Sequence, residues 1–269
     1  MRGAALGVVV LALLVFLALA APLVSPADPL YQDLLATLQA PSAAHLFGTD
    51  DLGRDVLARL IYGSRVSLEV GLISIGVALV GGVAVGLTAG YRGGAVDDVF
   101  MRLMDAISAF PSLILALAIT AALGAGITNA MVAIGLVYTP IFARLIRSQA
   151  LTIREMDYCQ AARALGAGPL RMMFKHIWPN ATAPIIVQGS LSVSSAIITE
   201  ASLSFLGVGV LPPTPSWGSM LSEGYQVLEI APWLAVASGS AIFITVLGLN
   251  FLGDGLRTAL DPRMSHGDA

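Results

Sequence analysis

Three carboxylates lie inside or at the ends of long apolar segments, and they are the residues of this chain best placed to do chemistry. They are Glu69, Asp105 and Glu200. A charge in hydrocarbon is costly and faces a bundle interior or water, so each is a candidate for lining a translocation path. For Glu200 the alternative is structural hydrogen bonding, and for Asp105, near the end of a predicted span, it is snorkelling or pairing with Arg102. Three acids alone do not make a proton relay.

The other reactive side chains argue against catalysis. None of the three histidines, His45, His176 and His266, lies in an apolar run, which argues against an intramembrane hydrolase. The one lysine, Lys175, lacks the preceding glycines of a phosphate-binding loop. The single cysteine, Cys159, excludes an internal disulfide and a multi-cysteine metal site, and we interpret it as a small buried residue. We expect no catalytic residue, metal site or bound cofactor in this chain.

The composition is that of a membrane protein with several spans. Of 269 residues, 57% are hydrophobic and 12% are charged, about half the charged share of a soluble domain. A bilayer core of about 30 Å needs about 20 apolar residues in a helix. We predict an all-α fold with six spans in one domain, at Gly3–Val24, Val66–Gly90, Val99–Leu123, Ala130–Ser148, Thr182–Leu206 and Trp233–Leu252.

The first span has a cleaved signal peptide as its alternative. Its apolar run is longer than the usual ~7–15 residues of such peptides, so we favour a retained span. Within the second span, Gly82, Gly86 and Gly90 recur every four residues, which lets one helix face approach a neighbouring backbone closely. Prolines Pro111, Pro140 and Pro184 lie in or near other spans, where helices tolerate kinks.

Basic residues predict the orientation of the chain in the membrane. With the N-terminus inside, the cytosolic loops and tail hold Arg92, Arg102, Arg144, Arg147, Arg154, Arg163, Arg171, Lys175, Arg257 and Arg263. The outer loop 207–232 has no Lys or Arg. The first outer loop, residues 25–65, carries arginines that lie close to aspartates, namely Arg54, Arg59 and Arg65 beside Asp50, Asp51 and Asp55. We predict that both termini are cytosolic.

A polar segment, Arg154–Asn180, interrupts the apolar chain between the fourth and fifth spans. Its first part suits a helix, because Tyr158, Ala161, Ala162 and Leu165 fall on one helical face. Gly166 then suits a left-handed helix end. Pro169 suits the first position of a second short helix, which Pro179 is predicted to end. A projecting knob and an amphipathic pair resting on the lipid surface are both open on these grounds.

Several motifs resemble one family. Gln160-Ala161-Ala162, followed by Gly166 and closed by Pro179, is similar to the EAA loop of bacterial ABC importer permeases. Three further segments are similar to the peptide- and nickel-type permeases: HLFGTDDLGRDVLARLIYGSRVSL (45–68), EASLSFLGVGVLPPTPSWG (200–218), and NFLGDGLR (250–257) with LDPR (260–263). Together they cover most of the chain after Ala40, and they resemble the second, C-type permease subunit of such importers.

The resemblance implies a type I importer fold whose loop 152–180 docks a cytosolic ATPase. Transferred to this chain, the coupling residues are Tyr158, Gln160, Ala161, Ala162, Leu165, Gly166 and Pro179. Two positions depart from the family pattern: the usual glutamate is Gln160, and the leucine usual before the proline is Trp178. The first departure puts any glutamate-specific ion pair in doubt, and docking would then rest on shape and on the small residues.

The resemblance also implies partners. They are a homologous second permease subunit, one or two ATPase subunits that bind ATP and Mg²⁺, and an extracytoplasmic substrate-binding protein, all at the inner membrane of a bacterium. The binding protein would dock on the outer segments 28–62 and 207–232, where Asp50, Arg54, Asp55, Pro213 and Trp217 are the candidate residues. Anchoring of the proline-rich loop at the interface is the alternative for the last two.

The implied function is to form half of the translocation path of an ATP-driven importer. Short peptides are the favoured substrate, with nickel chelates, haem and glutathione as substrates of relatives. No residue here chooses among them. The alternative is a proton-coupled secondary transporter using Glu69 and Glu200, which the missing internal repeat disfavours. Nothing in the chain suggests a nucleic-acid partner.

Overall fold

The computed structural model describes residues 2–260, and nearly all of its regular structure is helical. The helices are α1 (Arg2–Val24), α2 (Val56–Arg92), α3 (Gly94–Ser108), α4 (Ser112–Leu123), α5 (Ile127–Ile153), α6 (Asp157–Ala164), α7 (Pro169–Arg171), the π-helix η1 (Met172–Ile177), α8 (Trp178–Phe205), α9 (Trp217–Gln226) and α10 (Pro232–Leu260). Arg263, His266 and the end of the LDPR motif lie outside the described residues.

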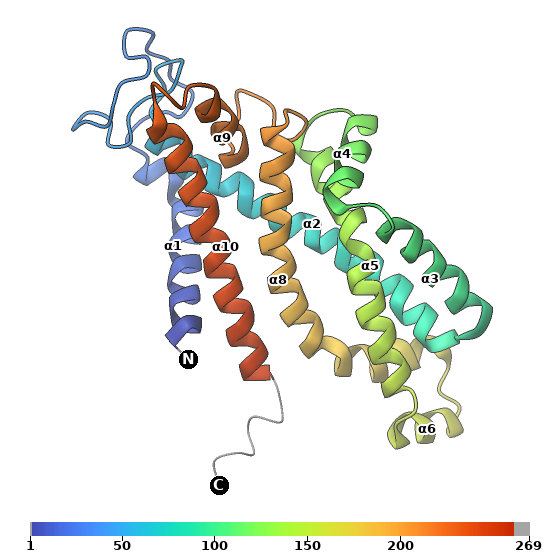
Figure 1. Cartoon of the computed structure of the whole chain (residues 1–269). Coiled ribbons are helices and arrows are strands. Elements are labelled where there is room, and N and C mark those ends of the chain that lie inside the picture. Colours follow the sequence, from blue (N-terminus) through green and yellow to red (C-terminus); the bar gives the residue numbers. More distant parts are fainter. Residues whose placement is uncertain (1, 261–269) are drawn as a thin grey trace.

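The long helices form a bundle with two distinct ends (Figure 1). At one end lie α6, the start of α1 and the end of α10. At the opposite end lie α9 and the long loop between α1 and α2. In the described part of the chain, extended pairing is limited to a single bridge between Thr49 and Asp55 in that loop.

Five helices are long and apolar enough to cross a membrane, and α3 with α4 makes a sixth if that bent pair counts as one span. The two helices of the pair meet at 91°. Pro111, at the N-cap of α4, explains the break, because proline has no N–H to donate and disfavours helical geometry in the residue before it. The third predicted span, Val99–Leu123, is therefore divided between two helices rather than one.

The second long helix begins at Val56, well before the predicted span start at Val66. Asp55 is its N-cap, and its Oδ1 accepts a hydrogen bond of 2.8 Å from the N–H of Ala58. Arginines Arg59 and Arg65 lie in this first part, so hydropathy alone does not include it in a span. The helix is thus a membrane span with a polar extension at its N-terminal end.

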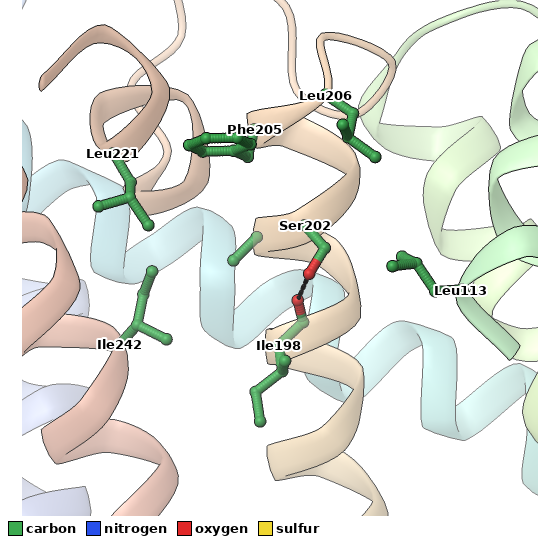
Figure 2. Close-up of a pocket in the computed structure, with 8 residues that line it drawn as sticks. Leu113, Ile198, Ser202, Phe205, Leu206, Leu221 and Ile242 are labelled. Atoms are coloured by element: carbon green, nitrogen blue, oxygen red, sulfur yellow. Dashed lines mark hydrogen bonds between the residues drawn. The ribbon is translucent and has the colours of Figure 1, made fainter. Parts of the chain in front are cut away.

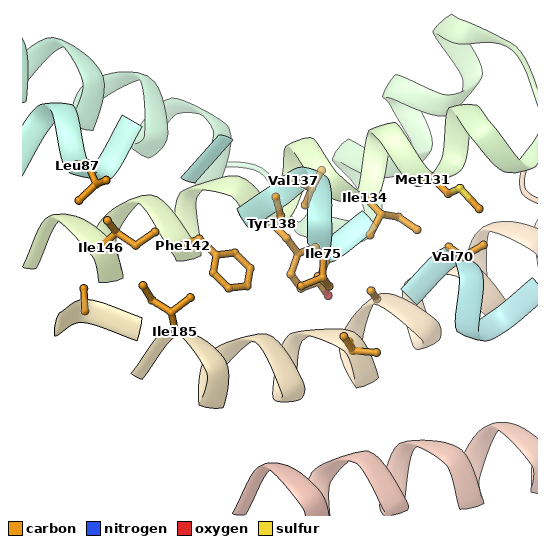
Figure 3. Close-up of a cluster of buried hydrophobic side chains, with 14 of the residues drawn as sticks. Val70, Ile75, Leu87, Met131, Ile134, Val137, Tyr138, Phe142, Ile146 and Ile185 are labelled. Atoms are coloured by element: carbon orange, nitrogen blue, oxygen red, sulfur yellow. The ribbon is translucent and has the colours of Figure 1, made fainter. Parts of the chain in front are cut away.

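The core lies where α2 packs against α5 and α8 (Figure 3). Its buried side chains include Val70, Ile75, Ile134, Tyr138, Phe142, Ile146 and Ile185. The glycine repeat permits this contact, as predicted: a Cβ at Gly82 would lie 2.4 Å from the Cβ of Phe142, and one at Gly86 would lie 2.5 Å from the carbonyl oxygen of Ala143. Any side chain there would push α5 away.

Arginines of α5 hold α3 against the bundle. Arg147 makes a two-pronged ion pair with Asp97, with its Nη2 2.6 Å from Oδ2. One turn earlier, Arg144 donates to the hydroxyl of Ser108 at 2.5 Å and lies 3.5 Å from Asp105. These contacts fix the direction of α3, which has few buried side chains of its own.

Candidate coupling and translocation sites

The segment from α6 to η1 projects from the end of the bundle at which α1 begins (Figure 1). After α6, Gly166 has φ +84°, the left-handed conformation that glycine adopts without strain. Pro169 then starts α7, as its position in the sequence predicts. The turn and the start of the second helix in this hairpin therefore lie at Gly166 and Pro169, as the sequence predicts.

Pro179 does not end the second short helix, and that prediction was wrong. The turn η1 runs directly into α8, and Pro179 lies in the first turn of α8. The turns just before Pro179 are of the wider π type, in which Trp178 donates to the carbonyl oxygen of Met173, and a helix can accommodate a proline at such a change of register. The hairpin is consequently joined to α8 by continuous helix, which lets a displacement of α6 and η1 pass into a core helix.

Cys159 anchors α6 to the bundle. Its side chain is fully buried and belongs to the same core cluster as Met172 and Ile177 of η1. Burial raises the pKa of the thiol, and it also raises the pKa of the neighbouring Tyr158 hydroxyl. This agrees with the structural interpretation of the cysteine and makes a reactive thiolate unfavourable at neutral pH.

Three of the residues predicted for the coupling face of α6 point away from that anchor: Tyr158 and Ala161 are exposed, and Leu165 is 89% exposed. Ala162 is half-buried and packs against the same core cluster as Cys159. Exposed apolar side chains continue beyond the turn at Leu170 and Phe174.

Polar contacts connect α6 to the end of α2. Arg154 donates from Nη1 to the carbonyl oxygen of Gly90 at 2.7 Å, and its Nε lies 2.9 Å from Glu155. Gln160 donates from Nε2 to the carbonyl oxygen of Glu155 at 2.9 Å, a bond that the family's glutamate has no N–H to make. Beside them, a recess of about 450 Å³ is lined by Tyr91, Arg92, Arg154, Glu155 and Arg163. The hairpin is thus held at its base by defined hydrogen bonds.

The three carboxylates in or near the spans have different surroundings. Glu200 is fully buried in α8, where its Oε1 accepts a 2.7 Å bond from Ser204. The same hydroxyl accepts from the N–H of Val210, so Glu200 helps to hold the turn after α8. Its Oε2 has no hydrogen-bond partner among the described residues. Glu69 is exposed on α2, and Asp105 is exposed beside Arg144 rather than Arg102.

Most of the predicted docking residues of the outer loops are buried. Asp50 is fully buried between Arg54, whose Nε is 2.6 Å from its Oδ2, and Arg59, which forms a second ion pair with it. Arg59 also lies 2.7 Å from Glu223 of α9. Neither Arg59 nor Glu223 was predicted to be a site residue. Their pairing, between residues far apart in the sequence, joins the predicted first outer loop to the second.

Two of the three remaining docking candidates are also buried. Asp55 caps α2 and lies 2.9 Å from His45. Trp217 is 2% exposed and donates from Nε1 to the carbonyl oxygen of Leu60 at 3.0 Å. Pro213 is exposed. Of the five, Pro213 alone is positioned to touch a docked protein, and the others give the outer loops their shape.

An apolar groove runs beside the half of α8 nearest α9 (Figure 2). It has a volume of about 360 Å³ and is lined by Leu113, Ile198, Ala201, Ser202, Phe205, Leu206, Leu221 and Ile242. The Phe205 ring packs edge-on against Tyr225 of α9, with 6.0 Å between ring centres. No charged residue lines this groove.

Comparison with known proteins identifies the family to which this bundle of spans with its projecting hairpin belongs. The chain belongs to the binding-protein-dependent transport system inner membrane component family, whose pattern matches residues 82–266. Residues 2–41 match the N-terminal TM domain of oligopeptide transport permease C. The family makes this chain a multi-pass permease of ABC importers at the inner membrane.

Individual relatives agree with this assignment. The chain is 45% identical to the dipeptide transport system permease protein DppC of Alkalihalophilus pseudofirmus, over 97% of this chain and 86% of the relative. It is 46% identical to the di/tripeptide transport system permease protein DppC of Pseudomonas aeruginosa, over 98% and 89%. It is also 44% identical to the glutathione transport system permease protein GsiD of Pectobacterium atrosepticum, over 84% and 75%.

A solved structure confirms the fold. A chain of the MetNI methionine ABC transporter in an inward-facing conformation superposes with a TM-score of 0.61 at 20% identity, covering 75% of this chain and 96% of that one. The predicted type I importer-like architecture is therefore confirmed.

Proposed function

We propose that this chain is one of two permease subunits of an ATP-driven importer of short peptides, and that α6 transmits the movement of a cytosolic ATPase to the bundle. The observation that carries this proposal is the α6 hairpin, exposed on one face, anchored by Cys159 on the other and continuous with α8. A rigid exposed hairpin joined to a core helix can pass a push into a packed bundle with two arrangements.

The remaining parts of the proposal follow from that hairpin. If α6 meets an ATPase, the end of the bundle that holds it is cytosolic, and both termini lie on that side, as the basic residues also indicate. The opposite end, with α9 and the loop 25–55, would then receive the substrate-binding protein. A homologous second permease would complete the path, and one or two ATPases would bind ATP and Mg²⁺.

Short peptides are the proposed substrate class because the first two relatives named above carry peptides in their names. The glutathione permease is compatible with the same class, since glutathione is itself a small peptide. The alternative of a proton-coupled secondary transporter has little support, because Glu200 is fully buried in this fold while Glu69 is exposed. No chain of titratable groups joins them among the described residues.

The test is uptake of a labelled dipeptide by cells that lack their own peptide permeases and express this chain with its partner subunits. We expect uptake that persists when an uncoupler collapses the proton gradient while ATP is maintained, and that stops when ATP is depleted. Excess unlabelled tripeptide should compete, whereas nickel and haem should not. Uptake that follows the proton gradient at constant ATP would refute the proposal.

A further inference from the structure

One face of α2 is uncovered along the length of the span. Its exposed residues recur at intervals of three or four and include Arg65, Glu69, Leu72, Ile73, Gly76, Val80 and Ala84. Val80 is 73% exposed and Leu72 is 62% exposed. The opposite face of the same helix forms the core with α5 and α8. This uncovered face is apolar except in its N-terminal part, which holds Arg65 and Glu69.

The contact of Arg65 with α1 gives the depth of Glu69. Arg65 donates to the carbonyl oxygens of Ala18 and Leu19. Ala18 lies about 9 Å along α1 from the outer end of that helix at Val24, at ~1.5 Å per residue. Glu69 lies one turn of α2 further inward, roughly 10–15 Å below that end, where a bilayer core of about 30 Å has its middle.

Glu69 has no partner at that depth within the described part of this chain. None of the ion pairs and side-chain hydrogen bonds found among residues 2–260 includes its carboxylate. Arg65, one turn away on the same helix, directs its Nε and one Nη to the carbonyls of α1. A carboxylate left in lipid at this depth is costly, so something other than lipid covers this face.

The rest of the face fits a helix. Gly76 has nothing within 4 Å of the position of an added Cβ, and Ala84, two turns further, is also small and exposed. Small residues spaced along one face let a second membrane helix approach closely, and a polar side chain between two helices sets their register. A water-filled path would not require the exposed run of Leu72, Ile73 and Val80.

We infer that this face of α2 is covered by a helix of the second permease subunit, which presents a basic side chain to Glu69. The inference rests on the proposed two-permease function and adds the surface and its chemistry. On this inference Glu69 positions the two subunits against each other and does not line the translocation path.

Photo-crosslinking in the full transporter tests the inference. p-Benzoylphenylalanine is placed at position 69, and in a matched variant at Phe16, an exposed aromatic of α1. We expect a light-dependent adduct with the second permease from position 69 and none from position 16. An adduct with lipid alone, with a second copy of this chain or with the ATPase would overturn it.

Two further measurements separate the alternatives. Because Cys159 is fully buried, Glu69→Cys can be labelled in the otherwise unsubstituted chain. Its thiol should resist a membrane-impermeant thiosulfonate reagent, and rapid labelling above that of the unsubstituted chain would mean that position 69 faces water. Glu69→Lys should lower the amount of second permease that co-purifies at least fivefold, and Glu69→Gln less. Equal recovery with both would overturn the pairing. Peptide uptake by the unsubstituted chain is measured separately. An error in the assignment of the α2 face can therefore be told apart from an error in the proposed import function.

Discussion

Arg65 donates a hydrogen bond from Nε to the main-chain carbonyl oxygen of Ala18. In a regular helix that oxygen would accept from the N–H of residue 22, but residue 22 is Pro22, which has no N–H. An arginine of α2 thus supplies the donor that a proline in α1 removes. The pair explains how a proline is accommodated inside a predicted span, and why α1 and α2 meet at this level.

We predict that Arg65→Met lowers the thermal stability of the purified complex, because it leaves this carbonyl unpaired at a cost of about 1–3 kcal/mol. Pro22→Ala in the same chain should restore most of the loss, since residue 22 then donates to Ala18 itself. Melting midpoints of the two single variants and the double variant measure the coupling. Additive losses would show that Arg65 acts elsewhere, for instance on the Tyr62 ring 5.7 Å away.

The contact of α2 with α5 should tolerate no added side chain. Gly86→Ala would place a Cβ 2.5 Å from the carbonyl oxygen of Ala143 and should cost about 1–3 kcal/mol through overpacking. Gly239→Ala is the control, because its Cβ would meet only Leu221 at 3.8 Å. Melting midpoints in detergent compare the two, and equal stability would contradict the tight contact.

Cys159 should resist alkylation in the folded protein. Its thiol is buried and its pKa is raised by burial, so the reactive thiolate is scarce at neutral pH. Maleimide labelling in mild detergent should be at least tenfold slower than in dodecyl sulfate. Because the pKa is higher folded than unfolded, the unfolded chain loses this proton first as pH rises, and alkaline pH should weaken the anchor. Equal labelling rates would mean that α6 is not anchored through this residue.

Gln160→Glu restores the family residue and should be tolerated. It loses the 2.9 Å bond to the carbonyl of Glu155, but the side chain is exposed, and such a bond contributes about 0.5–1.5 kcal/mol. Peptide uptake should stay within about twofold of the unsubstituted chain. A large loss of uptake would show that the partner surface has adapted to the amide.

Features carried by local chemistry were predictable from the sequence. The turn at Gly166 and the start of α7 at Pro169 follow from conformations that these residues favour, and the glycine repeat of α2 predicted its close packing. The α3–α4 break follows from Pro111, but a kink and a 91° bend look the same in sequence. The continuation of η1 into α8 through Pro179 depends on tertiary packing that the local rule does not contain.

The outer loops show what the sequence could not supply. Asp50, Arg54 and Trp217 were predicted as docking residues because they lie in the outer segments that the family resemblance assigns to the binding protein. Asp50 and Arg54 are instead buried with Arg59, whose ion pairs Glu223 completes from far along the chain. Trp217 is buried against α2, where it donates to a main-chain carbonyl oxygen. No local pattern connects these positions, so only the fold shows that they hold two loops together.

The central claim is that α6 docks the ATPase, and co-purification tests it most directly. Ala161→Asp adds a charge to an exposed position of the coupling face, whereas Thr258→Asp adds one to an exposed position near the end of α10, at the same end of the bundle. With affinity-tagged chain in mild detergent, Ala161→Asp should retain the second permease and lose at least nine-tenths of the ATPase. Thr258→Asp should keep both. A normal ATPase complement with Ala161→Asp would contradict the account.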